Sequence, residues 1–301
     1  MNKIKLAVTG CLGRMGQQII KSSKLDKKFK LVTLTENRKI NRKISGINPE
    51  LNDENAFKKA NIIIDFTVPN CTFQVLKIAS KLKKRVVIGT TGFTKKEEEL
   101  IKKYSRKIPI LKAGNMSLGI NLIMYLTEIA SSSLGNNFLS KVYEVHHKHK
   151  KDHPSGTALM LGKGIAVGKK KDFYRMIGNK YLSKIFEVHH KFKKDHPSGT
   201  ALMLGQGIAL GKSKNFYKMI GKKYLNKKNF PYGKKINFNS IRKGNTIGEH
   251  EVLFSSGKET IKLNHKAFDR ALYSEGALAA ANWLMKQKSG LYSMRDLMNF
   301  E

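Results

Sequence analysis

The first 112 residues alternate short apolar runs with helix-like segments, and this alternation limits the possible fold more than any other feature. Continuous apolar runs predict five strands, at residues 4–8, 29–36, 61–67, 85–93 and 108–111. Helical segments are expected between them, near 17–23, 72–82 and 94–104. Strands that are apolar throughout are typical of a parallel sheet covered by helices on both faces. The sequence therefore predicts an α/β fold.

Three glycines follow the first predicted strand and open the first helix. The spacing of Gly10, Gly13 and Gly16 suits a loop whose N–H groups and helix dipole hold a pyrophosphate. Leu12 stands where the usual pattern has its second glycine, so a plain structural turn explains these glycines equally well. Glu36 ends the second strand, where an acid accepts the ribose hydroxyls of a dinucleotide. The nearby Arg38 and Lys39 could instead bind a 2′-phosphate.

Two further loops, 89–92 and 113–116, follow the fourth and fifth predicted strands. Ligands of open α/β sheets lie beyond the carboxyl ends of the strands, so both loops are candidate cofactor contacts. Ordinary loops between strands and helices also favour Gly and Thr, so neither loop is specific by itself.

One segment occurs twice in the second half of the chain. Residues 144–162, EVHHKHKKDHPSGTALMLG, return at 187–205 with His149 replaced by Phe192, and the similarity extends over 144–184 and 187–227. Repeat folds need about three or more units to bury a continuous core. Two units favour a tandem duplication inside an ordinary domain.

The repeated segment carries the residue types of an acid–base and anion site. His146 and His147 end an alternating strand, Lys150 follows in a loop, and residues 155–157 begin a helix. Hydroxyl and free N–H groups at a helix start can hold a carboxylate, and the basic side chains add positive charge. His and Lys can also donate a proton near neutral pH. The segment therefore predicts a site for a small dianionic substrate.

A metal site is one alternative for this segment, with His146, His147, His149, Asp152 and His153 as ligands. The interleaved lysines would repel a cation and the second copy lacks His149, so no metal is expected. A solvated basic loop without function is the other alternative.

The net charge of +36 comes from 58 basic and 22 acidic side chains. The basic residues are mostly lysines scattered along the chain, without the motifs of specific nucleic-acid readers, so only weak nonspecific binding at low salt is expected. Cys11 and Cys71 form neither a disulfide framework nor a metal motif. No apolar run approaches the roughly 18 residues of a membrane span and no signal peptide is evident, so a cytoplasmic protein is expected.

The rest of the chain predicts a second domain of mixed structure. Helices are expected at 117–134 and 155–167, with a strand at 139–147 between them. Residues 236–267 predict three antiparallel strands joined by turns at Gly244 and Gly257, and an amphipathic helix closes the chain.

Outside the duplicated unit, nearly the whole chain resembles the dihydrodipicolinate reductase family, also called 4-hydroxy-tetrahydrodipicolinate reductase. The resemblance rests on VTGCLGRMG, IDFTVP, VIGTTGF, GNMSLGIN, EVHHKHKKDHPSGTA, IRKGNTIGEHEVLF and SGLYSMRDL. It implies a Rossmann-like dinucleotide-binding domain from residues 1–116 and 267–301. Residues 117–266 would form an α+β substrate and tetramerisation domain with a mixed sheet. The implied reaction is the NADH- or NADPH-dependent reduction of 4-hydroxy-tetrahydrodipicolinate in lysine and diaminopimelate biosynthesis.

The resemblance also implies roles for individual residues. His146 and Lys150 would be the acid pair, with second-copy equivalents His189 and Lys193. Substrate contacts would be His147, Ser155, Gly156 and Thr157, or His190, Ser198, Gly199 and Thr200 in the second copy. The cofactor contacts would be Gly10, Cys11, Leu12, Gly13, Arg14, Met15, Glu36, Gly89, Thr90, Thr91, Ala113, Gly114, Asn115 and Met116.

The first copy is expected to be the working one, because its strand follows directly from the preceding helix and it keeps His149. The second copy joins the downstream strands just as directly, so that alternative stays open. The other two hypotheses are an inactive relic of the reductase, whose substrate domain the duplication has spoiled, and a polycation that binds nucleic acid.

Overall fold

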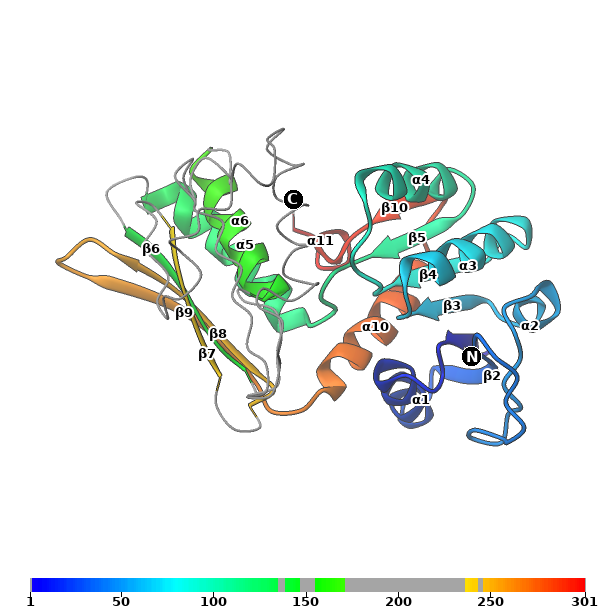
Figure 1. Ribbon diagram of the computed structural model, residues 1–301. Helices are drawn as coiled ribbons and strands as arrows, with labels where there is room; N and C mark the ends of the chain where they lie inside the picture. Colours follow the sequence, from blue (N-terminus) through cyan, green and yellow to red (C-terminus); the bar gives the residue numbers. More distant parts are fainter. Residues whose placement is uncertain (1, 135–138, 147–154, 171–235, 243–245, 301) are drawn as a thin grey trace, which may run out of the picture. The chain divides into compact units, whose positions relative to one another are not determined.

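A computed structural model describes residues 2–134, 139–146, 155–170, 236–242 and 246–300 (Figure 1). It divides into two compact units, Met1–Tyr125 with Ala267–Glu301, and Leu126–Lys266. The first unit is built from both ends of the chain. Among the described residues, no helix is long and apolar enough to cross a membrane.

The sheet of the first unit has six parallel strands in the order β10-β5-β4-β3-β1-β2. Its strands are β1 (Ile4–Thr9), β2 (Phe29–Thr35), β3 (Ile62–Asp65), β4 (Arg85–Ile88), β5 (Pro109–Lys112) and β10 (Gly290–Tyr292). β2 lies on one side of β1 and β3 on the other, so the direction of strand addition reverses at β1. Dinucleotides bind at this kind of reversal in open α/β sheets. The predicted Rossmann-like architecture is confirmed.

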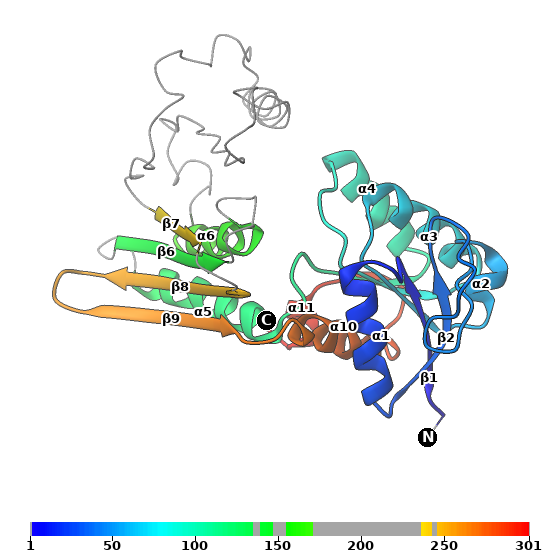
Figure 2. The same cartoon turned by 60° about the horizontal axis from the view of Figure 1, so that its bottom comes forward.

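Helices cover both faces of this sheet (Figure 2). They are α1 (Arg14–Leu25), α2 (Glu54–Lys58), α3 (Pro69–Lys81), α4 (Lys95–Ser105), α10 (Ala271–Leu284) and α11 (Met294–Leu297). Leu6 and Val8 of β1 lie in one buried cluster with residues of α1 and α10, whereas Ala7 lies in another with residues of α3 and α4. Successive strand residues point to opposite faces, so a strand covered on both sides must be apolar throughout.

The sequence pattern did not predict the sixth strand. β10 pairs with β5 in parallel, Leu291 opposite Ile110, and Tyr292 packs edge-on against Trp283 with ring centroids 5.3 Å apart. Three residues are too few to show a periodicity. Pairing with the edge of β5, and not a sequence pattern, therefore determines this strand.

The second unit contains a four-stranded mixed sheet in the order β7-β6-β8-β9. Its strands are β6 (Leu139–His146), β7 (Ile236–Arg242), β8 (Gly248–Ser255) and β9 (Thr260–Ala267). β6 runs parallel to β7 and antiparallel to β8, so the predicted mixed sheet is confirmed.

One strand prediction is wrong. Residues 236–267 do not form three adjacent antiparallel strands, because β6 lies between β7 and β8. β8 and β9 do follow one another through a turn at Gly257, which has a positive φ of 86°. Gly244 lies outside the described residues. Alternation of apolar residues tells which face a strand buries but not which strand lies beside it.

Two helices accompany this sheet: α5 (Leu118–Leu134), which begins in the first unit, and α6 (Gly156–Gly168). The limit expected at residue 116 lies just before α5, whereas the division into compact units falls inside this helix. The buried Ser131 hydroxyl of α5 donates to the Ile165 carbonyl of α6 at 2.7 Å. The end of β6, residues 144–146, and all of α6 come from the first copy of the repeat, and the second copy, 187–227, lies outside the described part of the chain.

Candidate active site

The tight glycine loop after β1 leaves no room for a side chain at Gly10 or Gly16. Gly10 has a φ of +60°, and a Cβ atom there would lie 2.8 Å from the Thr67 methyl carbon. A Cβ atom at Gly16 would lie 2.2 Å from the Gly10 carbonyl oxygen. Gly13 closes the turn by donating its N–H to that oxygen at 2.9 Å, and no side chain caps the start of α1. An uncapped helix start behind a tight glycine loop fits a pyrophosphate.

Glu36 connects the end of β2 to this loop. One carboxylate oxygen accepts the Leu12 N–H at 3.1 Å and the other accepts the Asn37 N–H at 3.0 Å. The Leu12 side chain packs against the apolar core of the first unit, which explains why a residue other than glycine fits there. Arg38 and Lys39 are exposed beside Glu36.

Cys11 lies in the same loop but is a core residue. Its side chain is fully buried, and burial, followed by the negative charge of Glu36, raises its thiol pKa to about 11. A thiol with that pKa is neutral near pH 7 and a poor nucleophile. Cys11 therefore shapes the loop through its packing and its backbone.

A buried carboxylate organises the neighbouring strand ends. Asp65, the last residue of β3, accepts hydroxyl hydrogen bonds from Thr9 at 2.6 Å, Thr67 at 2.6 Å, Thr72 at 2.5 Å and Thr90 at 3.1 Å. Thr90 also accepts the Thr67 N–H at 2.9 Å. These bonds join the ends of β1, β3 and β4 at the edge where the cofactor is expected.

The other predicted cofactor residues lie at the same edge of the sheet. Thr90 is buried and supports the loop, whereas Thr91 is exposed. Asn115 accepts the Ser117 N–H at 2.9 Å through its side-chain oxygen, and its carbonyl accepts from Asn121 at 2.9 Å. Of the remaining predicted contacts, the exposed residues are Gly13, Arg14 and Gly114, the half-buried ones are Gly10, Leu12, Met15, Gly89 and Ala113, and Met116 is buried. The residues present therefore fit a dinucleotide.

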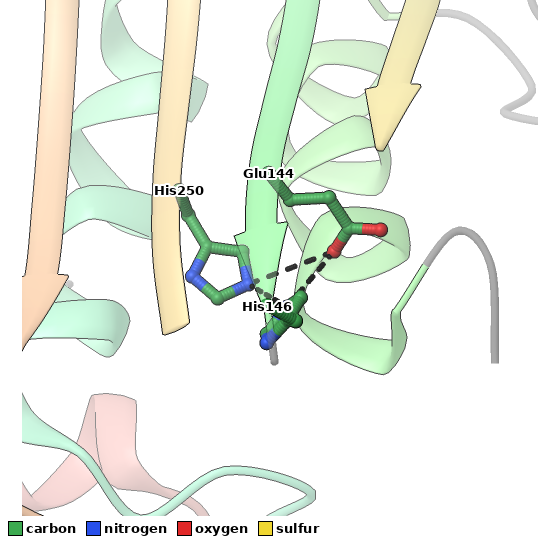
Figure 3. Close-up of side chains that lie close together, drawn as sticks. All are labelled: Glu144, His146 and His250. Atoms are coloured by element: carbon green, nitrogen blue, oxygen red, sulfur yellow. Dashed lines mark hydrogen bonds and ion pairs between the residues drawn. The ribbon is translucent and has the colours of Figure 1, made fainter. Parts of the chain in front are cut away.

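In the second unit, Glu144, His146 and His250 form a buried group (Figure 3). Glu144 and His146 are two residues apart on β6 and share one face of the sheet, and His250 comes from the adjacent strand β8. The His146 Nε2 atom lies 3.2 Å from a Glu144 carboxylate oxygen and 3.1 Å from the His250 Nε2 atom. The His146 Nδ1 atom lies 3.3 Å from the Ile247 carbonyl oxygen.

Ser155 links this group to α6. Its N–H donates to the other Glu144 oxygen at 2.9 Å, and its hydroxyl caps the helix by accepting the Ala158 N–H at 3.1 Å. The hydroxyl also lies 3.4 Å from the His250 Nε2 atom. Gly156 is exposed and Thr157 half-buried at the helix start. The structure thus brings His146 and Ser155 together.

Several predicted residues lie outside the described ranges: His147, Lys150, His189, His190, Lys193, Ser198, Gly199 and Thr200. Four proposed ligands of the metal alternative, His147, His149, Asp152 and His153, lie outside them as well. The ligand atoms of Glu144, His146 and His250 lie within 4.8 Å of one another, a spacing that could also suit a cation. The net charge of +36 opposes cation binding, and the absence of a metal stays a prediction.

The prediction from sequence missed three residues, Glu144, His250 and Asp65. Glu144 stands two residues before His146 in both copies of the repeat, so a strand with period two could have placed it on the same face. His250 lies more than 100 residues away, and only the pairing of β6 with β8 brings it close.

Both halves of the chain match one protein family. The dihydrodipicolinate reductase N-terminus matches residues 4–116, and the dihydrodipicolinate reductase C-terminus matches 119–176 and again 170–298. A 4-hydroxy-tetrahydrodipicolinate reductase of Pelagibacter ubique is 64% identical over 300 residues, which cover 100% of both chains.

The chain belongs to the dihydrodipicolinate reductase family.

A family member from Buchnera aphidicola (subsp. Schizaphis graminum), also a 4-hydroxy-tetrahydrodipicolinate reductase, is 36% identical over 317 residues, covering 98% of this chain and 96% of its own. Among solved structures, a dipicolinate-bound dihydrodipicolinate reductase from a Paenisporosarcina species has a TM-score of 0.69 at 21% identity. It covers 97% of this chain and 98% of its own, and shares the fold.

Family membership confirms that the chain is an NAD(P)H-dependent oxidoreductase. The comparisons give no support to the nucleic-acid hypothesis. Each of the two C-terminal matches contains one copy of the repeated segment, and the Pelagibacter match extends across both copies.

Proposed function

We propose that the chain reduces 4-hydroxy-tetrahydrodipicolinate to tetrahydrodipicolinate with NADH or NADPH. One observation carries the proposal: His146, inside the segment most specific to the family, lies buried between a carboxylate and a second histidine. That environment suits a side chain that stores and donates a proton.

In the reaction, the hydroxyl group leaves as water together with a hydrogen of the neighbouring ring carbon, and the unsaturated ring then takes up a hydride and a proton. The reduced nicotinamide, when bound, supplies the hydride. His146, with Lys150, delivers the proton to the neighbouring ring atom. The glycine loop holds the pyrophosphate at the start of α1, and Glu36 is the acceptor for the ribose hydroxyls.

The start of α6 is the proposed cradle for the substrate's carboxylates. Ser155, Gly156 and Thr157 supply backbone N–H and hydroxyl groups, and the basic residues His147 and Lys150 neutralise the two negative charges. We assign cofactor binding to residues 1–116 and 267–301, and substrate binding and assembly into a homotetramer to 117–266. A biosynthetic enzyme of this type works in the cytoplasm.

The test is the oxidation of reduced nicotinamide, with substrate made in the same cuvette by the dehydratase that joins pyruvate and aspartate semialdehyde. Cofactor should be consumed only when both precursors and the dehydratase are present. A folded protein that consumes neither NADH nor NADPH would contradict the proposal and support the hypothesis of an inactive relic of the reductase.

We expect both cofactors to work, with NADH preferred. A carboxylate at Glu36 accepts both ribose hydroxyls and repels a 2′-phosphate. The exposed Arg38 and Lys39 favour NADPH, but salt screens long-range attraction beyond about 8 Å at physiological ionic strength. A strong NADPH preference in kcat/KM that persists at this ionic strength would show a direct phosphate contact and contradict the expectation.

A further inference from the structure

We infer that Glu144 is the positioning residue of this active site: it keeps a transferable proton on His146 and links His146 to Ser155 at the start of α6. The inference rests on the proposed function for its catalytic meaning.

The contacts around His146 favour a hydrogen on each ring nitrogen. The Ile247 carbonyl oxygen can only accept, so the Nδ1 atom, 3.3 Å away, carries a hydrogen. A neutral ring would then present a bare Nε2 atom to a Glu144 oxygen at 3.2 Å, so two acceptors would face each other. A hydrogen on the His250 Nε2 atom serves the contact between the two rings and lies near the same Glu144 oxygen, 3.7 Å from His250 Nε2. It still leaves the His146 Nε2 atom and that oxygen as two acceptors 3.2 Å apart.

A second hydrogen on His146 removes this conflict. Placed on the Nε2 atom, it faces both the Glu144 oxygen at 3.2 Å and the His250 Nε2 atom at 3.1 Å. The pair then holds one proton more than an ionised carboxylate beside a neutral imidazole, and that proton can be given to a substrate.

Because the group is buried, His146 needs the negative charge of Glu144 beside it to hold two hydrogens. The relative exposure is 2% for Glu144, 6% for His146 and 3% for His250. An isolated charge is costly to bury, whereas an imidazolium beside a carboxylate is neutral as a pair. Without the negative charge of Glu144, the buried ring would keep only one hydrogen.

The other Glu144 oxygen acts on the chain itself. It accepts the Ser155 N–H at 2.9 Å, at the start of α6. The carboxylate therefore contacts the residue just before segment 147–154 and the residue just after it.

The elements beside His146 differ in the groups that they bring near the ring. β8 contributes His250 and the backbone of Gly248, where a Cβ atom would lie 3.1 Å from His146 Cε1. α6 contributes Ser155 and has no acidic residue in its first turn, and on β7 Arg242 is the register partner of His146. Among the described side chains, Glu144 and His250 are the ionisable groups hydrogen-bonded to the ring.

The variant Glu144→Gln separates the two roles. Its amide oxygen can still accept the Ser155 N–H, while its NH₂ group donates to the His146 Nε2 atom and fixes the ring in the neutral form. We expect kcat to fall about 10²-fold or more, the usual scale for a proton-transfer group, with KM changed by less than about threefold.

Glu251→Gln is the matched control. Glu251 lies on β8 in the same sheet, and its carboxylate is 3.9 Å from the Lys262 ammonium, outside the group around His146. Its replacement should leave kcat and the pH profile unchanged. Glu144→Asp, which keeps the charge, should recover part of the activity lost in Glu144→Gln. Equal losses in the Gln and Asp variants would indicate a merely structural role and overturn the inference.

Protonation is also read directly, without turnover. Protein labelled with ¹⁵N-histidine should show His146, assigned by its loss in His146→Asn, with both ring nitrogens protonated, and with one protonated in Glu144→Gln. The same signal in both proteins would overturn the inference even if the enzyme is active. A stoichiometric metal in the purified protein, removed by a chelator with a change in this signal, would show a cation in place of the proton. If the wild type is inactive but shows the expected signals, the proposed function fails and the inference about Glu144 stands.

Discussion

Replacing Asp65 with Asn should weaken the first unit far more than an ordinary Asp→Asn change. The carboxylate accepts four threonine hydroxyl groups, two on each oxygen. An Asn side chain offers NH₂ in place of one oxygen, so two of these donors lose their acceptor. A hydrogen bond to a charged group contributes about 1.5–3 kcal/mol, which gives a loss of about 3 kcal/mol at the lower value.

Some of this loss can be recovered locally. The Thr72 hydroxyl lies 3.3 Å from the Val68 carbonyl oxygen, and the Thr9 hydroxyl 3.4 Å from that of Ile64, so each has a second acceptor within reach. We therefore expect the free energy of unfolding to fall by about 2–3 kcal/mol, which for a unit of this size lowers Tm by roughly 4–12 °C. Binding of NADH should weaken as well, because the same bonds order the loops after β1, β3 and β4.

The chain has a single tryptophan, and Trp283 lies in α10 of the first unit. Its fluorescence during urea unfolding therefore reports this unit. Asp26→Asn is the control: Asp26 accepts one backbone N–H, from Lys28 at 2.9 Å, and an amide oxygen can replace that acceptor. If Asp65→Asn unfolds at the urea midpoint of the control, the cluster of threonines does not stabilise the unit and the reasoning is wrong.

Three further outcomes are expected. Lys150→Ala should lower turnover by about 10²-fold or more while Lys193→Ala does little, and the reverse result would assign the site to the second copy. Cys11 should resist alkylation in the folded protein because burial raises its pKa to about 11, whereas the partly exposed Cys71 should react first; thiol counting before and after unfolding checks this. Burial lowers the pKa of His265 from its usual 6.5. The unfolded chain therefore binds more protons than the folded one as pH falls below about 6.5, and the free energy of unfolding decreases there. His265→Gln should reduce this decrease, which denaturation at pH 5 to 7 measures.

The sequence predicted those parts of the fold in which local pattern and tertiary environment agree. The strands of the first unit were visible because burial on both faces makes each of them apolar throughout, as Leu6, Ala7 and Val8 illustrate. β10 was missed because a neighbouring strand, rather than its own composition, determines its conformation. The position of β7 was wrong because apolar alternation is compatible with either neighbour.

The candidate site also combines residues that a local pattern predicts with residues that only the tertiary structure brings together. His146 and the start of α6 were predicted from residue types within one short segment. Glu144 belongs to that segment but resembles an ordinary strand residue until its two oxygens are seen to contact His146 and Ser155. His250 could be found only from the pairing of strands distant in sequence, information that residue spacing does not contain.

The first unit contains segments from both parts of the chain that flank the second unit, and β10 completes its sheet. Extra residues in the second unit therefore lengthen a connection between two segments of the first. Leu126–Lys266, roughly 140 residues, act as one long loop between the two parts of the first unit. Loop-closure entropy rises as about (3/2)RT ln n, so extending such a loop from roughly 100 to roughly 140 residues costs only about 0.3 kcal/mol. The duplicated segment therefore changes the stability of the dinucleotide-binding unit very little. Any larger destabilisation would come from the packing of the second unit.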